Sequence, residues 1–194
     1  MRGLLIAFEG LDQSGKQTQA EALRDAVVGR GRTCELLSFP DYGTAIGREI
    51  GAALQGQRDY TPDVMQLLYI ANRFEKKPHL QDALAAGTVV VCDRYLASSI
   101  AYGEAQGLDP RWLAEIQRPL PQPDLTILLD IVPETAARRK ATNRDRYERD
   151  LALLARVRDS YRRQAADQHW LHLDGERDRS LVSTDVIAAV ASRL

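Results

Sequence analysis

The feature that most constrains this chain is a glycine-bounded loop that joins an apolar run to a helix-forming segment. The loop follows the apolar residues 4–8 and reads Gly10-Leu11-Asp12-Gln13-Ser14-Gly15-Lys16. A strand that ends in such a loop and opens a helix is the layout of a phosphate-binding loop. Glycine permits backbone geometry that a Cβ would obstruct, so successive N–H groups can face one anion at the positive end of the helix. The pattern favours a phosphate site over a purely structural turn.

The residues around Lys16 refine this prediction. The lysine side chain supplies a flexible cation that can follow a phosphoryl group as it moves. Ser or Thr usually follows this lysine and holds Mg²⁺, but here the position is Gln17, and Thr18 comes one residue later. The substitution leaves the arrangement of the magnesium ligands open.

Length and composition indicate one globular domain, which we expect to span residues 1–194. The chain is 44% hydrophobic and 27% charged, which is ordinary for a globular protein of this size. It has no apolar run of membrane-spanning length, and its N-terminus lacks the regions of a signal peptide. We therefore expect a cytoplasmic protein with no membrane partner.

The charges nearly balance, with a formal net charge of −1, but one segment is strongly basic. Between Glu134 and Arg163 there are ten Lys or Arg residues and five Asp or Glu residues. Such a segment is a solvated helix surface, a flap over a polyphosphate or a nucleic-acid-binding stripe. The overall balance and the lack of interleaved aromatic residues make nucleic acid the least favoured partner.

Cysteine and histidine are sparse and lie in strand-like runs. Cys34 and Cys92 are surrounded by apolar residues, so we expect them to be reduced core residues and not a disulfide or a metal pair. His169 and His172 flank an apolar pair in a further strand-like run, which disfavours a metal site there.

Five apolar runs have the character of strands, and several are apolar on both faces, as strands covered by helices on each side should be. The runs are residues 3–8, 33–39, 88–92, 125–131 and 169–173. Segments with helical periodicity separate or follow them, at residues 16–29, 62–77, 96–105, 147–168 and 180–193. This alternation predicts an α/β fold, a doubly wound parallel sheet with right-handed crossovers.

The helical segment 62–77 has two distinct faces. Thr61 and Pro62 are typical of a helix start, as N-cap and first helical residue. One face is an apolar stripe of Val64, Leu67, Leu68, Ala71 and Phe74. The other face carries Gln66, Tyr69 and Arg73 at helical spacing. An aromatic ring and an arginine there are either idle surface or a device that stacks on a planar base and hydrogen-bonds to it.

Charged residues follow the strand at 88–92. Asp93 and Arg94 come at its carboxyl end, where ligands bind in open α/β sheets, so both should face the same crevice as the phosphate-binding loop. A carboxylate there can hold Mg²⁺, and an arginine can bind a phosphate through two N–H groups. A plain ion pair at the strand end is the alternative. Asp130 ends the next strand similarly, and we interpret it as structural.

Together these segments resemble the thymidylate kinase family. The shared segments occur in order over about residues 3–175: Phe8-Glu9-Gly10-Leu11-Asp12, Gly15-Lys16, Phe39-Pro40, Ala71-Asn72-Arg73-Phe74-Glu75, Asp93-Arg94-Tyr95, Ser98, Ala101-Tyr102 and Asp145-Arg146-Tyr147-Glu148. The resemblance implies a P-loop kinase with a five-stranded parallel sheet, helices on both faces and a mobile basic lid at about residues 138–149. It also implies a homodimer that transfers the γ-phosphoryl group of ATP to dTMP with the help of Mg²⁺.

The resemblance assigns roles on the donor side. The loop would hold ATP through Gly10, Gln13, Ser14, Gly15, Lys16, Gln17 and Thr18. Arg139 would pack on adenine, Asp93 would serve the metal, and Arg94 would bind the phosphates between donor and acceptor. Positions 12–14 contain no arginine, so Arg144 or Arg146 of the lid would supply the cation that stabilises the transition state.

On the acceptor side, Phe39 and Pro40 would line the dTMP site. Tyr69 stands where the family usually has a phenylalanine that stacks on thymine, and Arg73 stands where a side chain reads a carbonyl of the base. The other acceptor contacts implied are the base edge for Ser98 and Ser99, the deoxyribose for Tyr102, the sugar or its metal for Asp12, and closure from the lid for Tyr147 and Glu148.

Three positions depart from the family pattern. Besides Gln17, Gln13 stands where one branch carries an arginine, and Tyr42-Gly43 replaces the Arg-Ser or Arg-Gly that follows Phe-Pro in many members. Two alternatives stay open. One is a kinase for another nucleotide or nucleoside, and the other is an inactive nucleotide-binding protein, which Gln17 suggests.

Overall fold

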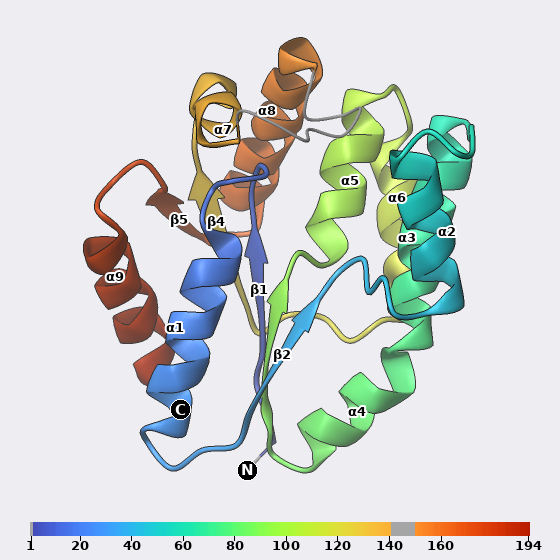
Figure 1. Ribbon diagram of the computed structural model, residues 1–194. Coiled ribbons are helices and arrows are strands. Elements are labelled where there is room, and N and C mark those ends of the chain that lie inside the picture. The colour runs from blue at the N-terminus through green and yellow to red at the C-terminus, as the bar shows by residue number, and fades with distance from the viewer. Residues whose placement is uncertain (1, 141–149) are drawn as a thin grey trace.

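A computed structural model of the chain describes residues 2–140 and 150–194 (Figure 1). Its five strands are parallel and form one sheet in the order β2-β3-β1-β4-β5. The strands are β1 Leu5–Glu9, β2 Cys34–Ser38, β3 Val89–Asp93, β4 Leu125–Asp130 and β5 Leu171–Asp174. From β1 the chain crosses to β2 and returns to β3, and it then continues to β4 and β5 on the other side of β1. The strand order therefore changes direction next to β1, and a ligand is expected in the crevice at the carboxyl end of that strand.

Helices cover both faces of this sheet, as Figure 1 shows. Helices α1 Lys16–Val28 and α9 Arg179–Ala191 pack on one face. The other helices are α2 Ala45–Leu54, α3 Pro62–Glu75, α4 Lys77–Ala85, α5 Leu96–Ala105, α6 Pro110–Gln117, α7 Pro133–Arg139 and α8 Leu151–Asp167. None of the helices in the described ranges is long and apolar enough to cross a bilayer.

The alternation of side chains along β1 explains why the central strands are apolar throughout. Ile6 and Phe8 point to the face under α1 and α9, where they join a core with Leu23. Leu5 and Ala7 point to the opposite face and join a core with α4. Because both faces are covered, every position of the strand is buried, which is typical of parallel sheets.

The structure confirms the predicted fold class and the five strands, each displaced by no more than two residues at either end. Helix α8 begins at Leu151 and not at 147, because the side chain of Asp150 caps it by accepting a hydrogen bond from the backbone N–H of Leu153. Arg138 and Arg139 belong to α7, so the predicted lid segment 138–149 overlaps a helix at its start. Its remaining residues, 141–149, lie outside the described residues.

The apolar stripe predicted on α3 divides between surface and core: Leu68 and Phe74 are half-buried against core clusters. Val64 and Leu67 are 37% and 44% exposed, whereas Met65 and Ile70 are buried together with polar Gln66, Asn72 and Arg73. Helix α3 packs mainly against α2 and α5, and its inner face borders a polar pocket. Thr61 does occupy the N-cap position, but its hydroxyl bonds the carboxylate of Asp63 and no backbone N–H.

Candidate functional site

The phosphate-binding loop joins β1 to α1 in a strained backbone path. Gly10 has φ 139°, and a Cβ there would lie 2.4 Å from the carbonyl oxygen of Leu129 on β4. Gly15, directly before α1, has φ 96°, a conformation that side chains rarely adopt. The loop therefore needs both glycines, and it places the N-terminus of α1 at the carboxyl edge of the sheet (Figure 1).

Lys16 is only 5% exposed and lies within the loop. Its Nζ donates a hydrogen bond of 2.8 Å to the backbone carbonyl of Leu11. Burial lowers the pKa of this ammonium group, as does the nearby Arg94, while the carboxylates of Asp93 and Asp12 act in the opposite direction. The side chain is thus held within the loop. A bound anion there would compensate for the solvation that the ammonium group loses on burial.

A large open pocket surrounds the loop, and we call it the donor pocket. It is lined by Gln13, Ser14, Gly15, Lys16, Gln17, Thr18, Asp93, Arg94, Arg139, Arg177, Arg179 and Val182, among others. The Arg139 guanidinium lies across its rim and donates hydrogen bonds to the carbonyl oxygens of Gln13 (2.9 Å) and Gly175 (3.1 Å). Gln17 is exposed, and its amide donates to Glu21 one turn along α1. Neither Arg177 nor Arg179 was singled out from the sequence.

Arg94 directly follows β3 with φ 65°. Its guanidinium donates hydrogen bonds to Asp12 at 2.8 Å and to the hydroxyls of Ser98 and Tyr161, both at 3.1 Å. Burial raises the pKa of Asp12, but the positive charges of Arg94 and Lys16 outweigh it and hold that pKa far below its usual range. Asp12 is therefore an anion at neutral pH, and it holds Arg94 in place.

The fully buried carboxylate of Glu9 binds the same two hydroxyl groups, those of Ser98 and Tyr161, that Arg94 contacts. It accepts hydrogen bonds from the backbone N–H of Tyr95 (2.9 Å), the hydroxyl of Ser98 (2.6 Å) and the hydroxyl of Tyr161 (3.2 Å). Neither Glu9 nor Tyr161 was predicted from the sequence to have a role in the site. A carboxylate at the end of an otherwise apolar strand was the signal that could have identified Glu9.

A second pocket, which we call the acceptor pocket, lies between α3, α5 and the loop after β2. It is lined by Asp12, Phe39, Pro40, Tyr42, Leu54, Gln66, Tyr69, Arg73, Arg94, Ser98, Ser99 and Tyr102. Arg73 is 3% exposed, and one terminal nitrogen donates to Ser99 Oγ (2.8 Å) and to Gln117 Oε1 (3.0 Å). Gln117, which lies on α6, was not predicted from the sequence.

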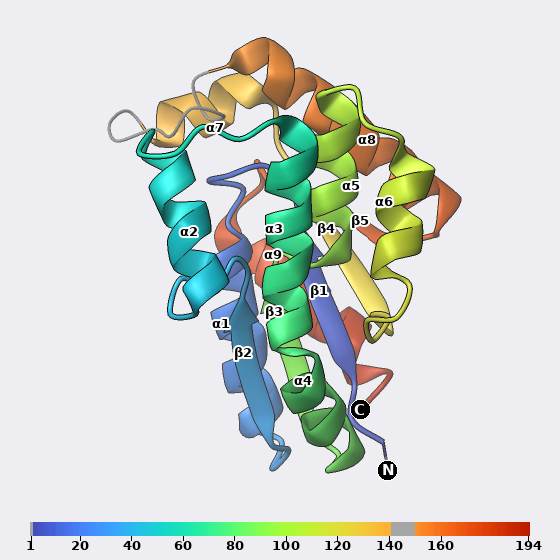
Figure 2. The same cartoon turned by 90° about the vertical axis from the view of Figure 1, so that its right-hand side faces the viewer.

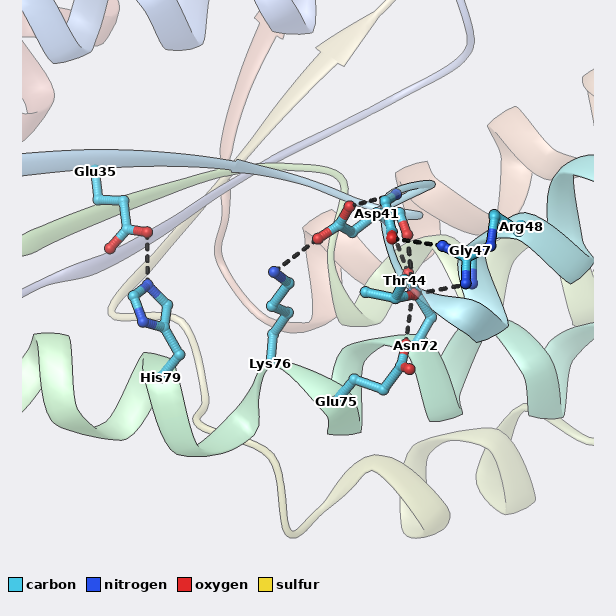
Figure 3. A network of polar contacts seen from close by, with 10 residues as sticks. Glu35, Asp41, Thr44, Gly47, Arg48, Asn72, Glu75, Lys76 and His79 are labelled. Carbon is cyan, nitrogen blue, oxygen red and sulfur yellow. Dashed lines mark hydrogen bonds and ion pairs between the residues drawn. The ribbon is translucent and has the colours of Figure 1, made fainter.

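The loop after β2 carries Phe39, Pro40 and Tyr42 into both pockets, and α3 holds it (Figure 3). The buried amide of Asn72 accepts from the backbone N–H of Asp41 at 2.7 Å and donates to its carbonyl oxygen at 3.2 Å. The same amide donates to the hydroxyl of Thr44, which caps α2 (2.9 Å). On the outer side, Lys76 pairs with the Asp41 carboxylate at 2.7 Å.

Asp93 is a residue of the donor pocket that could hold a metal ion. Its Oδ1 is buried with no hydrogen-bond partner among the described residues, and the same holds for Ser14 Oγ in the loop. Hard oxygen atoms of this kind suit Mg²⁺. Residues 2–140 and 150–194 hold no group of three or more metal-binding side chains, so a bound ion would take its remaining ligands from phosphates and water.

Most of the predicted site residues meet at this one edge of the sheet. Asp12, Phe39, Pro40, Tyr42 and Arg94 line both pockets, so the donor and acceptor pockets join there. Asp130 forms a separate cluster, accepting from Arg158 at 2.6 Å and contacting His172 at 3.1 Å, which agrees with a structural role. The predicted lid residues Arg144, Arg146, Tyr147 and Glu148 lie outside the described residues.

Comparison with known proteins identifies the family. A sequence model of the thymidylate kinase family matches residues 8–186. Thymidylate kinase from Schizosaccharomyces pombe is 40% identical over 148 residues, which cover 76% of this chain and 70% of that protein. The Caenorhabditis elegans thymidylate kinase is 34% identical over 200 residues, covering 95% of this chain and 88% of that protein.

The fold agrees with these relatives. A solved structure of thymidylate kinase from Candida albicans superposes with a TM-score of 0.87 at 30% identity, and the match covers 99% of this chain and 92% of that one. The loop, the residues that end β3 and the two joined pockets lie within the region that the family model covers. The chain therefore belongs to the thymidylate kinase family.

Proposed function

We propose that this chain phosphorylates dTMP to dTDP with ATP as the phosphoryl donor. The observation that carries this proposal is the junction of the two pockets, at which Asp12 and Arg94 border both. A donor γ-phosphate in the loop and an acceptor phosphate from the other side would meet at Arg94. Phosphoryl transfer needs alignment and charge neutralisation more than covalent help, and this junction offers both.

On the donor side, the loop amides and Lys16 hold the phosphates of ATP. The loop backbone is already in its strained conformation, so little reorganisation accompanies binding. Arg139 lies at the rim between the loop and Gly175, where its planar guanidinium can stack on adenine. Arg177 and Arg179 line the same rim and add positive charge near the donor.

Asp93, Ser14 and Thr18 are the residues that would hold Mg²⁺. The unpartnered oxygens of Asp93 and Ser14 fit such an ion, whereas Gln17 is turned toward Glu21 on the helix surface. Bound Mg²⁺ would supply neutralisation of the charge on the donor phosphates. The departure at Gln17 thus leaves two hydroxyls and a carboxylate for this task.

On the acceptor side, Tyr69 stacks on thymine and Arg73 hydrogen-bonds to one of its carbonyl groups. Ser99 holds the Arg73 guanidinium, and Ser98 connects Arg94 to Glu9, so both serines act on neighbours of the substrate. Tyr102 lies against the Arg94 guanidinium, 5.4 Å from its ring centroid, and borders the deoxyribose. We expect its ring to exclude a 2′-hydroxyl.

A coupled assay of ADP release tests the function. We expect kcat/KM for dTMP to exceed that for dCMP and UMP by roughly 100-fold or more, because a site that hydrogen-bonds one base strongly rejects others. The Candida albicans structure is described as revealing the origin of broad substrate specificity, so the panel should include dGMP. Preference for another monophosphate would replace dTMP as substrate. ATP binding without turnover on any acceptor would identify an inactive homologue.

The lid residues complete the proposal. Arg144 or Arg146 closes over ATP and stabilises the transferring phosphoryl group, and Tyr147 and Glu148 close over dTMP. Replacing each arginine with alanine should lower kcat and leave ATP affinity nearly unchanged. Loss of ATP affinity with kcat intact would make the lid an anchor, and the catalytic cation would then be Arg94.

We also propose a homodimer with a cytoplasmic location. The support for the dimer is the exposed apolar surface of Val64 and Leu67 on α3 and Trp112 on α6, each between 37% and 44% exposed. In Figure 2, α3 runs down the face turned toward the viewer, with α2 on one side and α6 on the other. Cell fractionation with an antibody against the chain tests the location.

A further inference from the structure

Tyr161 of α8 brings a buried hydroxyl group to Arg94, although the two residues lie 67 positions apart in the chain. The tyrosine is 1% exposed, and its ring packs in the core between α5 and α8 with Ala97 and Val157. Its hydroxyl accepts a hydrogen bond of 3.1 Å from Nη1 of Arg94 and lies 2.8 Å from the hydroxyl of Ser98. Tyr161 lines neither the donor nor the acceptor pocket, so any effect that it has on a substrate passes through these neighbours.

The hydrogen bonds around this hydroxyl have a fixed direction. A guanidinium can only donate, so the hydroxyls of Tyr161 and Ser98 both accept from Nη1 of Arg94, each at 3.1 Å. A carboxylate can only accept, and Oε2 of Glu9 receives hydrogen bonds from the same two hydroxyls, at 3.2 Å and 2.6 Å. Burial raises the pKa of Tyr161, so this phenol keeps its proton at neutral pH. The two hydroxyls therefore connect the cation of Arg94 to the buried carboxylate of Glu9.

The other terminal nitrogen of Arg94 is held less completely. Nη2 donates to Asp12 at 2.8 Å, but its contact with the Tyr102 hydroxyl is long, at 3.4 Å. The Arg94 side chain is 14% exposed and lines both pockets, so a ligand can reach it. A phosphate that enters the junction of the pockets can replace the weak contact with Tyr102, while Nη1 stays bound to the protein.

Fixing one nitrogen of an arginine favours binding through the other. Arginine has a long side chain with many rotamers, and a guanidinium that is already oriented loses less conformational entropy when it binds an anion. An oriented guanidinium also keeps the bound phosphate aligned for transfer.

We propose that Tyr161 is a positioning residue, whose hydroxyl is oriented by Glu9 and holds the Arg94 guanidinium in place to receive the phosphate of the acceptor. The inference rests on the proposed function, which places that phosphate at Arg94. Tyr161 should therefore affect how the enzyme binds the phosphate of dTMP and not how it binds the nucleoside.

The test compares dTMP with thymidine, which has the same base and sugar but no phosphate. Titration calorimetry gives Kd for each ligand, and the ratio of the thymidine Kd to the dTMP Kd measures the contribution of the phosphate. Tyr161→Phe keeps the buried ring and loses only the hydroxyl. In this variant we expect the ratio to fall about 10-fold, because a buried N–H of Arg94 loses its partner. Kd for thymidine should stay within about 2-fold, and kcat for dTMP should fall by about 10-fold or more.

The matched control is Tyr95→Phe. Tyr95 is also fully buried, and its hydroxyl donates to the backbone carbonyl of Pro121 at 3.0 Å. Neither of these residues lines the donor or the acceptor pocket. The two variants should lose stability to a similar extent in urea unfolding, but only Tyr161→Phe should change the ratio. Equal weakening of dTMP and thymidine in Tyr161→Phe would give Tyr161 a structural role and overturn the proposal.

Glu9→Gln is a second variant, which also decides the matter if Tyr161→Phe does not fold. Oε1 of Glu9 accepts from the backbone N–H of Tyr95, so a glutamine that keeps this bond turns its NH₂ group toward the two hydroxyls. They can then no longer donate to position 9, and the ratio should fall as it does in Tyr161→Phe. An unchanged ratio in the folded variants, with dTMP turnover normal in the wild type, would reject the positioning role alone. Absence of dTMP turnover in the wild-type protein would instead overturn the proposed function.

Discussion

Lys16 is buried, and in the protein without ligand its ammonium group has only partly regained the hydrogen bonds and counter-charge that it loses with water. Its Nζ donates a hydrogen bond to the carbonyl of Leu11, and burial lowers its pKa. A phosphate that enters the donor pocket would give the ammonium group a full counter-charge in a site shielded from water. If the proposed function holds, the residue acts on the reacting phosphate.

Lys16→Ala should lower kcat by roughly 100-fold or more, since it removes a preorganised cation from the phosphoryl group in transit. Circular dichroism and the urea midpoint should stay close to those of the wild type. Lys77→Ala is the control, because this lysine packs over Phe74 outside both pockets. Near-normal turnover in a folded Lys16→Ala protein would contradict the phosphate-binding role of the loop.

The ion pair of Asp12 and Arg94 should make stability depend on acid pH. The pKa of Asp12 lies far below its usual range in the folded protein, so its charged form stabilises the fold at any pH above the unfolded value of about 4. That contribution is lost as pH falls below about 4 toward the folded pKa. In urea unfolding, Asp12→Asn should be less stable than wild type at pH 7, and the difference should shrink below pH 4.

The control for this prediction is Asp185→Asn. Asp185 pairs with Arg177 at 2.8 Å, but both side chains are about 40% exposed, so the pair should contribute little. Its removal should change stability by less than about 0.5 kcal/mol at either pH. A pH-independent loss in Asp12→Asn would show that the carboxylate's charge is not what stabilises this site.

At the scale of elements, α3 positions the loop after β2. Asn72 bonds both the N–H and the carbonyl of Asp41, as a neighbouring strand would, and also bonds the residue that caps α2 (Figure 3). The hydrogen bond from Phe39 N–H to the carbonyl of Asp93 ties the start of the loop to β3, and the Asn72 amide holds the loop further along. The position of Phe39 and Tyr42 between the pockets thus depends on a helix.

Asn72→Ala should raise KM for dTMP about 10-fold or more and lower the free energy of unfolding by about 1–3 kcal/mol, because buried backbone groups of the loop lose their partner. Asn72→Asp keeps the acceptor for the Asp41 N–H and should recover part of the KM. Lys76→Ala, which removes only the outer ion pair with Asp41, should change KM little. If Lys76→Ala had the larger effect on KM, the ion pair and not the amide would hold the loop.

At the scale of the whole molecule, the exposed apolar side chains of α3 predict self-association. Sedimentation at micromolar concentration should give a species of twice the 21.7 kDa chain mass. Leu67→Arg should shift this species to the monomer without loss of fold, because the position is 44% exposed. Leu181→Arg on α9, 53% exposed on the opposite face of the sheet, is the control and should leave the mass unchanged. A wild-type protein that sediments as a single chain would reject the dimer.

Local patterns in the sequence were sufficient for the loop, the strands and the strand-end residues. The glycines at 10 and 15, Lys16, Asp93 and Arg94 are identifiable because each is defined by its immediate neighbours and by the end of a strand. The carboxyl ends of parallel strands meet at one edge, so their assembly into one site follows from the fold class. The family resemblance added the acceptor residues, and the structure brings those in the described ranges to one pocket.

The tertiary structure alone decided which face of α3 is inside. Helical periodicity places Val64 and Leu67 in an apolar stripe, yet the packing of α3 against α2 and α5 leaves these two side chains exposed and buries Gln66, Asn72 and Arg73. The hydrogen bond from Ser98 to Glu9 and the one from Arg73 to Gln117 likewise join residues that are far apart in the chain. A sequence determines the spacing of side chains along an element, but the surfaces that they meet depend on how the elements pack, and so do their hydrogen-bond partners.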